Sequence, residues 1–116
     1  MKTKNLIIIA EIGINHNGSL KIAKKLVDVA KDSGANYVKI QNYIPELIVT
    51  RNTPKAKYQK NHDNNKTMYE MLKKNHFNFN KTSELIKYCK KKKINFLSSP
   101  FDDLSFQFLK KKKLKL

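Results

Sequence analysis

Blocks of apolar and polar residues follow one another in an order that predicts a strand, a helix and a second strand. The first strand is predicted over Leu6–Ile12, because its apolar run is typical of a strand buried on both faces of a parallel sheet. A polar loop follows, and Ser19 is a suitable N-cap for a helix with an amphipathic apolar repeat. Gly34 ends that helix, and the strand Tyr37–Gln41 completes a βαβ unit with a right-handed crossover.

The second half of the chain repeats this pattern after a long polar segment. Residues Asn42–Thr67 are predicted as a loop, and loops of this length are usually functional excursions or disordered. Helices are predicted over Met68–Lys74 and Asn80–Lys92, followed by the strand Ile94–Ser98. A turn then leads into a third helix that begins at Leu104.

The repeated strand–helix order, with no signal for an antiparallel hairpin, predicts an α/β fold. We expect three parallel strands in the order 1-2-3, with the helices on one side. Three such strands would leave sheet edges unpaired and apolar surface exposed, and the lysine-rich end of the chain does not resemble a domain boundary. We therefore interpret residues 1–116 as the incomplete N-terminal part of a larger α/β domain.

The charge of the chain is strongly positive but does not indicate nucleic-acid binding. The formal net charge is +16, and of 25 Lys and Arg residues only Arg51 is an arginine. A surface selected to read bases or to grip phosphates bidentately would use arginine more often. We expect no nucleic-acid partner, and we interpret the lysines as solvated surface residues.

The cysteine content and the N-terminal segment predict the compartment. A single cysteine, Cys89, excludes an internal disulfide, and its place among apolar helix positions predicts a buried structural thiol. The apolar run before Glu11 is too short for a secretory signal or a membrane span. We therefore expect a cytoplasmic protein with no membrane partner.

Polar side chains stand at or near the carboxyl ends of the predicted strands. They are Glu11 in the first, Lys39 and Gln41 in the second, and Ser98 and Ser99 after the third. These ends meet on one face of a parallel sheet, where α/β proteins bind their ligands. Lysine and serine hydroxyl groups together suit a phosphate or carboxylate, and a carboxylate opposite them suits a base or a partner of a metal-bound water.

A simpler interpretation of the same residues is also open. A carboxylate at the edge of a buried sheet is costly unless something pairs with it. Lys39 and Glu11 can satisfy one another as an ion pair with no further role. The spacing of the residues does not separate this alternative from a ligand pocket.

Four segments of the chain stand out together: Ile9–Gly18, Tyr37–Gln41, Tyr69–Leu72 and Phe96–Asp102. In order and spacing they resemble motifs of the sialic acid synthase family, which makes N-acetylneuraminate and related nonulosonic acids. The resemblance covers essentially the whole chain. It implies the N-terminal portion of a (β/α)₈ TIM barrel, comprising about three βα units. It also implies condensation of phosphoenolpyruvate with an N-acetylated hexose such as N-acetylmannosamine.

The resemblance also assigns roles to individual residues. It implies that Glu11 is catalytic, near the metal, its water and the reacting carbon of the sugar. It implies that Lys39 and Ser99 contact phosphoenolpyruvate, with Ser99 standing where relatives often carry threonine. Asn64 falls near a substrate-contacting asparagine in the long loop. His16 would orient the loop after the first strand.

Other parts of the complete enzyme are expected to lie outside this chain. The resemblance implies a divalent metal, Mn²⁺ or Mg²⁺, held by two histidines on later strands, so we expect no metal ligand here. We interpret His62 and His76 as solvated. The family's C-terminal antifreeze-like domain is absent from the sequence, and the complete enzyme is expected to be a homodimer.

Two functions follow from these observations. The first is a sialic acid synthase-type enzyme, represented by an N-terminal fragment that is inactive alone. The second is a non-catalytic truncated product, or a basic remnant that binds anions loosely.

Overall fold

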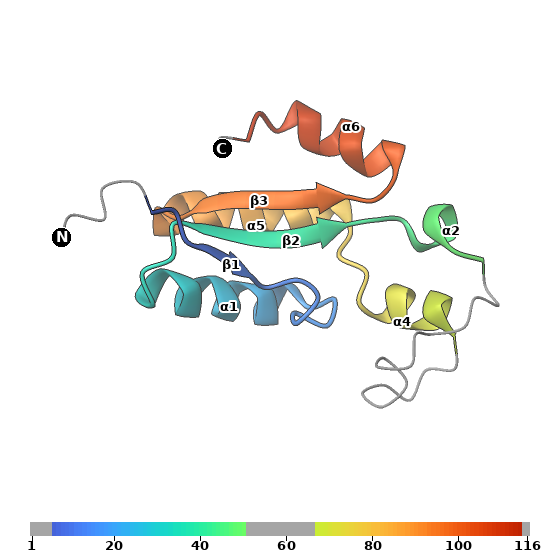
Figure 1. The fold of residues 1–116 in the computed structure, drawn as a ribbon, viewed down its shortest axis with the longest axis horizontal. Helices are drawn as coiled ribbons and strands as arrows, with labels where there is room; N and C mark the ends of the chain where they lie inside the picture. Colours follow the sequence, from blue (N-terminus) through green and yellow to red (C-terminus); the bar gives the residue numbers. More distant parts are fainter. Residues whose placement is uncertain (1–5, 51–66, 115–116) are drawn as a thin grey trace.

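The computed structural model describes residues 6–50 and 67–114, which form three strands and five helices (Figure 1). In chain order they are β1 (Ile9–Glu11), α1 (Leu20–Asp32), β2 (Tyr37–Asn42), α2 (Pro45–Ile48), α4 (Met68–Lys74), α5 (Phe79–Lys92), β3 (Asn95–Pro100) and α6 (Asp103–Lys111). The α/β fold expected from the sequence is confirmed.

The three strands form one parallel sheet in the order β1-β2-β3, as predicted. Ile9 pairs with Tyr37 at the start of the β1–β2 ladder, and Tyr37 pairs with Asn95 at the start of the β2–β3 ladder. The strands therefore run in step, and β2 and β3 end together near α2, while β1 ends earlier, opposite Lys39 (Figure 1).

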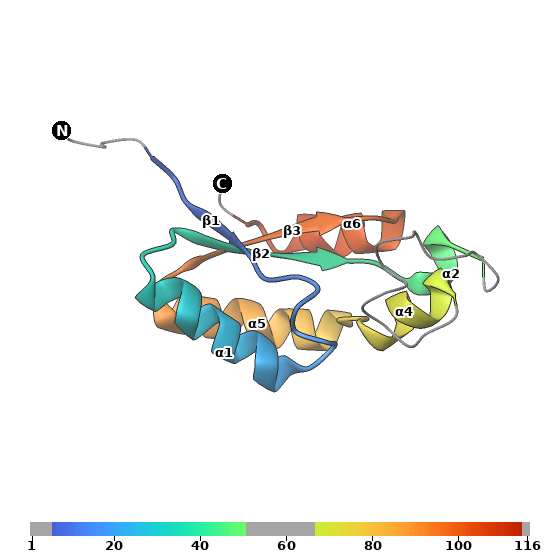
Figure 2. The ribbon, with the colours of Figure 1, turned by 60° about the horizontal axis from the view of Figure 1, so that its bottom comes forward.

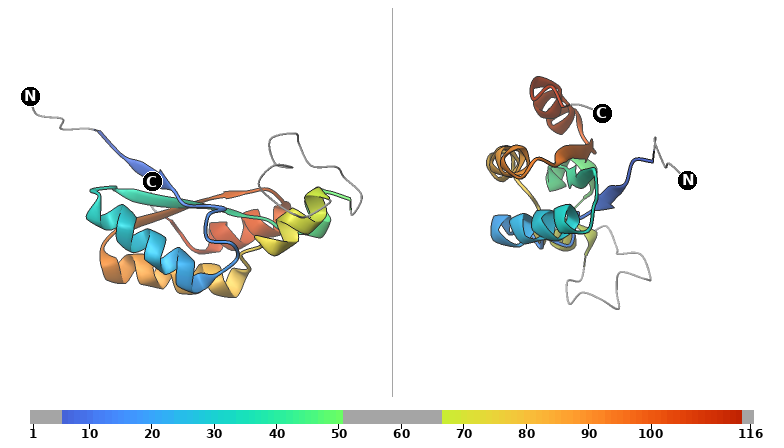
Figure 3. Two further views of the ribbon diagram at one scale, coloured as in Figure 1. Left: turned by 90° about the horizontal axis from the view of Figure 1, so that it is seen from below. Right: turned by 90° about the vertical axis from the view of Figure 1, so that its left-hand side faces the viewer.

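The helices cover one face of the sheet. Helices α1 and α5 lie side by side against it (Figure 2), and the end-on view shows α6 further round the same side (Figure 3). The core between these layers is apolar; its side chains include Val27, Val38, Ile40, Leu85 and Leu109. The rings of Phe79 and Phe108 stack at 4.4 Å between centroids and join α5 to α6.

Side-chain caps explain where four helices begin. Ser19, Thr67, Asn78 and Asp102 each accept a hydrogen bond from the backbone N–H three residues later. A cap of this kind contributes about 1 kcal/mol to helix stability. At the other end of α1, Gly34 adopts a φ of +89°, which a residue with a side chain disfavours. The predicted start and end of this helix are both confirmed.

The first strand differs from the prediction in length and burial. It covers three residues rather than Leu6–Ile12, and Leu6 and Ile9 are 66% and 43% exposed. The expectation of a strand buried on both faces is therefore wrong for this chain. The physical reason is position: β1 is an edge strand, and within the described residues the helices cover only one face of the sheet.

The segment predicted as a loop over Asn42–Thr67 begins with an element that the prediction missed. Helix α2 has Pro45 at its first turn, where the absent backbone N–H costs nothing. The helix is one turn long, too short to show an apolar period. The other boundaries lie within two residues of the predictions, and α4 matches its predicted range.

Two further predictions concern the burial of Cys89 and the absence of a membrane span. Cys89 is 1% exposed, and burial raises the pKa of its thiol to about 12. The predicted burial of this thiol is confirmed. In the part of the chain that is described, none of the helices has the length and apolar character needed to cross a bilayer.

Candidate functional site

Glu11 and Lys39 lie directly opposite one another on β1 and β2. The parallel register pairs their Cα atoms, and their side chains form an ion pair of 3.0 Å between Oε1 and Nζ. Paired residues project from the same face of a sheet. The side chains are 55% and 32% exposed, so solvent reaches both groups. The carboxylate is therefore not forced into this pair by burial, and it remains accessible to a ligand.

Ser99 lies on the same face as this pair, two residues further along the strands. It is the register partner of Gln41, while Leu97 is the partner of Lys39. From ideal strand spacings, the Cα atom of Ser99 is about 8 Å from that of Lys39 and about 12 Å from that of Glu11. The structure thus brings three of the residues predicted for the site to one face. Asn64, the fourth, lies outside the described residues.

The adjacent serine, Ser98, has a structural role on the opposite face. Its hydroxyl donates to Asn42 Oδ1 at 2.6 Å, and Asn42 Nδ2 donates to Thr82 Oγ1 at 2.8 Å. Asn42 and Thr82 are fully buried. This network satisfies buried polar groups between β2, β3 and α5. Of the two serines that the sequence places at the strand end, Ser99 alone faces the Glu11–Lys39 pair.

The loop after β1 packs tightly against β2. The backbone N–H groups of Ile12 and Gly13 both donate to the carbonyl of Lys39, at 2.9 and 3.3 Å. A Cβ atom on Gly13 would lie 3.1 Å from the backbone nitrogen of Gln41. A larger residue at position 13 would push the loop away from the end of the sheet.

His16 is buried in this loop and stabilises it. Its Nδ1 accepts a hydrogen bond from the N–H of Gly18 at 3.0 Å, and its ring lies 4.6 Å from that of Phe77. Burial, with a smaller contribution from Lys81, lowers the pKa of His16 to about 4. Lys81 Nζ donates to the carbonyl of Gly18 at 2.6 Å. The neutral imidazole therefore acts as an acceptor that fixes the loop.

Of the other two histidines, the structure describes only His76. The sequence predicts a solvated His76, but the residue is half-buried, with its ring 5.7 Å from that of Tyr43. Burial is the largest influence on its pKa, which lies below the usual value. The expectation for His76 is therefore wrong, because the β2–α2 segment covers it. His62 lies outside the described residues.

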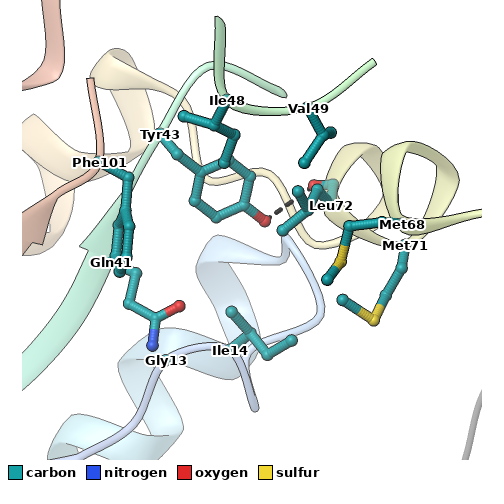
Figure 4. A pocket seen from close by; sticks show the side chains of 10 residues that line it. All are labelled: Gly13, Ile14, Gln41, Tyr43, Ile48, Val49, Met68, Met71, Leu72 and Phe101. Carbon is teal, nitrogen blue, oxygen red and sulfur yellow. Dashed lines mark hydrogen bonds between the residues drawn. The ribbon is translucent and has the colours of Figure 1, made fainter. Parts of the chain in front are cut away.

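A pocket of about 390 Å³ opens at the carboxyl ends of β1 and β2 (Figure 4). Gln41 projects into it from β2, next to Tyr43, and Met68 and Met71 line the side formed by α4. No periodic signal along the chain predicts this pocket, because its walls come from separate segments. The family resemblance includes Tyr69–Leu72 but does not indicate that Met71 lines a cavity.

The described residues contain no metal centre. Within 6–50 and 67–114, no three His, Cys, Asp or Glu side chains come close enough together to hold an ion. Glu11 stands beside a lysine, a poor neighbour for a metal cation. Residues 6–50 and 67–114 therefore supply no complete set of ligands for the divalent metal that the family resemblance implies.

Comparison with known proteins identifies the family. Residues 26–116 match the NeuB family. The chain belongs to this family. It is 41% identical over 114 residues to the N,N'-diacetyllegionaminic acid synthase of Campylobacter jejuni, covering 97% of this chain and 34% of that protein. It is 34% identical over 102 residues to the human N-acetylneuraminate-9-phosphate synthase, covering 88% of this chain and 28% of that protein.

The NeuB-family fold is also found in solved structures. An N-acetylneuraminic acid synthetase from Leptospira borgpetersenii, determined in complex with citrate, matches with a TM-score of 0.75 and 30% identity. The match covers 96% of this chain and 34% of that one. The chain thus spans about a third of the length of these relatives. The family resemblance inferred from the four motifs is confirmed, and the family's named members make sialic and related acids.

Proposed function

We propose that this chain supplies the first three βα units of a (β/α)₈ barrel enzyme that condenses phosphoenolpyruvate with an N-acetylated hexose. The product would be a sialic or other nonulosonic acid. The observation that carries the proposal is the shared face of Glu11, Lys39 and Ser99 at the carboxyl ends of three consecutive parallel strands. In parallel α/β folds this end of the sheet binds ligands.

Lys39 and Ser99 are suited to hold phosphoenolpyruvate. The ammonium group neutralises a phosphate or carboxylate, and the hydroxyl group of Ser99 donates a hydrogen bond to the same anion. Lys39 Nζ has three hydrogens, so its contact with Glu11 leaves donors for a ligand. A small anion bound between β2 and β3 would touch both residues.

Glu11 is suited to act as a general base. Carbon 3 of phosphoenolpyruvate attacks the aldehyde carbon of the sugar, which forms the new C–C bond and leaves an electron-deficient carbon 2. Water adds to carbon 2 and loses one proton to the Glu11 carboxylate, which passes it to the former aldehyde oxygen to give a hydroxyl group. The C2–O bond to the phosphate then breaks, and the remaining hydroxyl at carbon 2 becomes the ketone as its proton leaves with the inorganic phosphate. The carboxylate is half exposed and lies next to the proposed phosphoenolpyruvate site, so water has access to it.

The rest of the site belongs to the remaining two thirds of the enzyme. We propose that a divalent cation, Mn²⁺ or Mg²⁺, is held there and that it polarises the aldehyde oxygen when bound. We also propose that the complete enzyme carries the antifreeze-like domain, forms a homodimer and is cytoplasmic. The isolated chain should therefore bind phosphoenolpyruvate without turning it over.

Two measurements on the 116-residue chain test this proposal. Titration with phosphoenolpyruvate should shift the backbone amide signals of Lys39 and Ser99 in NMR spectra. No inorganic phosphate should be released when N-acetylmannosamine and Mn²⁺ are added. Equal shifts with inorganic sulfate would favour a basic remnant that binds anions loosely, and absence of any shift at these amides would contradict the assigned roles. Sustained phosphate release would contradict the inactivity of the fragment.

A further inference from the structure

A second pocket lies at the other end of the sheet from the candidate site. It has a volume of about 400 Å³ and opens between the last turns of α5 and α6, beside the start of β3. Both helices end where β3 begins (Figure 1). Asn95 lines the pocket at the first position of β3, about 13 Å along the strand from Ser99. A small ligand bound here would therefore leave the candidate site free.

The buried part of the wall is apolar. Ile94 and Phe96, where the chain enters β3, are each 5% exposed. Cys89 of α5 is buried, and its thiol is neutral because burial raises its pKa to about 12. Ile86 and Leu114 are half-buried and extend this surface toward solvent. The volume of the pocket is within the range of small-molecule sites.

Three exposed lysines, Lys90, Lys112 and Lys113, form the rim of the pocket. Among the described residues, none of these ammonium groups pairs with a carboxylate. The acidic residues of α5 and α6 lie elsewhere: Glu84 pairs with another lysine of α5, and Asp103 begins α6 at the far end of that helix. The positive charge at the rim therefore has no counter-charge within the part of the chain that is described.

Lysines in the last turn of a helix also offset the negative end of the helix dipole. This effect explains only part of the charge at the rim. Carbonyl groups in the last turns of both helices already accept hydrogen bonds, from Ile94 N–H to the carbonyl of Cys89 at 3.0 Å and from Lys113 N–H to the carbonyl of Lys110 at 3.4 Å. Lys113 lies beyond the end of α6. The rim ammonium groups are therefore available to an anion from outside.

An apolar wall below a basic rim selects a ligand with both characters. An apolar chain gains free energy from contact with the wall, in proportion to the area that it removes from water. A phosphate, sulfate or carboxylate group would lose its hydration against that wall, but at the rim it meets three ammonium groups. The methylene stems of the lysines continue the apolar surface up to these groups. An inorganic anion gains nothing from the wall, and a neutral chain gains nothing from the charges.

We propose that this pocket binds an amphipathic anion, a single acyl or alkyl chain that ends in a phosphate, sulfate or carboxylate group. The chain contacts Ile94 and Phe96, and the anionic group contacts the ammonium groups of Lys90 and Lys113. The inference does not depend on the proposed function, because the two sites lie at opposite ends of the sheet. It gives this chain a second binding site with its own ligand class.

The test titrates the full chain with octyl phosphate, below the concentration at which it forms micelles. The backbone amide signals of Ile94 and Asn95 in NMR spectra should shift saturably. Butyl phosphate has the same head group and four fewer methylenes, and it should bind at least about ten-fold more weakly, because each buried methylene strengthens binding by up to about four-fold. Octyl glucoside has the same chain without the charge and should also bind about ten-fold or more weakly. Inorganic phosphate should not shift these two signals.

A matched pair of double variants tests the rim. Lys90→Gln with Lys113→Gln removes two charges from the pocket and should weaken octyl phosphate binding about three-fold or more, with no change for octyl glucoside. Lys91→Gln with Lys111→Gln removes the same charge from neighbouring exposed positions that do not line the pocket, and it should change neither. Lys112 is kept because its ammonium group also lies 5.1 Å from the centre of the Phe108 ring. Backbone amide spectra show whether each variant is folded.

Vesicles distinguish two sources of such an anion. Co-sedimentation of the chain with phosphatidylglycerol vesicles and not with phosphatidylcholine vesicles, lost in the Lys90 and Lys113 double variant, would assign the site to a lipid headgroup. Binding of octyl phosphate without co-sedimentation would assign it to a free acyl anion. Both results agree with the proposed chemistry.

Three results would overturn the inference. Equal binding of octyl phosphate and octyl glucoside would show an apolar pocket that ignores charge. Equal binding of butyl and octyl phosphate would show loose binding of anions at the surface. Equal effects of the two double variants would show that the rim lysines have no special role.

Discussion

The Asp102 carboxylate accepts a hydrogen bond from the backbone N–H of Ile44 at 2.7 Å, across 58 residues of sequence. The same side chain caps α6 by accepting from the backbone N–H of Ser105 at 2.8 Å. One carboxylate therefore fixes the turn after β3 to the segment after β2. These two segments follow Ser99 and Gln41, so Asp102 holds both sides of the candidate site in register.

Replacement of Asp102 should destabilise the fold. Asp102→Ala removes a helix cap and leaves the N–H of Ile44 without its partner, at a cost of about 2 to 3 kcal/mol. Urea unfolding followed by circular dichroism measures the change in the free energy of unfolding. Asp103→Ala is the matched control, because Asp103 is exposed in the first turn of α6 and should cost less than about 1 kcal/mol. Equal losses in the two variants would contradict the structural role of Asp102.

The Glu11 carboxylate should be needed for turnover of the complete enzyme. This chain can be joined to the remaining two thirds of the Campylobacter jejuni relative, to which it is 41% identical. In an active fusion, Glu11→Gln should lower kcat by about 10²- to 10⁴-fold, the usual cost of losing a general acid or base. Phosphate release measures the rate. Glu84→Gln, on an exposed part of α5, should retain full activity, and unchanged kcat in the Glu11 variant would exclude the residue from the chemistry.

His16 should make stability depend on pH between about 6.5 and 4. The pKa is about 4 in the folded chain and 6.5 for a solvated histidine, so in this range the unfolded state binds the proton and the folded state does not. The free energy of unfolding therefore falls as the pH is lowered through this range, by at most about 3 kcal/mol. Urea unfolding at a series of pH values measures the slope.

The variant His16→Gln separates this effect from other titrations. Glutamine can still accept the Gly18 N–H but takes up no proton, so the slope between pH 6.5 and 4 should become shallower. His76→Gln is the comparison variant, because the pKa of His76 is also lowered and its protonation can contribute to the same slope. An unchanged slope in the His16 variant would contradict the assigned burial of its neutral form.

The uncovered strand β1 should cause self-association of the isolated chain. Ile9 is 43% exposed on an edge strand, which offers both apolar surface and unpaired backbone groups. Ile9→Thr keeps the β-branched shape and should reduce the associated fraction in sedimentation velocity. Val29→Thr, at a 62% exposed position on α1, should not. Equal association of both variants with the unchanged chain would show that β1 is not the contact.

Local signals in the sequence are sufficient to predict most of the fold. Ser19 and Gly34 bracket α1 because a cap and a positive φ are properties of a few neighbouring residues. Burial of β1 cannot be predicted in the same way. Leu6 and Ile9 are apolar residues of a type that is usually buried, but none of the described residues covers them.

The sequence predicts only part of the candidate site, because local signals mark its strand-end residues but not its pocket. The positions of Glu11, Lys39 and Ser99 follow from strand ends, which the sequence marks clearly. The pocket combines the β1 loop, β2, α2, α4 and Phe101, and their approach depends on tertiary packing alone. In the sequence, Met68 and Met71 therefore resemble ordinary apolar helix positions.

The opposite orientations of Ser98 and Ser99 have a consequence for how this segment can change during evolution. Ser98 is held in a buried hydrogen-bond network, so replacing it requires compensating changes at Asn42 or Thr82. Ser99 faces the open side of the sheet, where threonine would keep the hydroxyl group. An insertion or deletion of one residue before β3 would exchange the two positions. Lineages of this protein should therefore accumulate substitutions at position 99 freely between serine and threonine, and should rarely change the length of the α5–β3 turn.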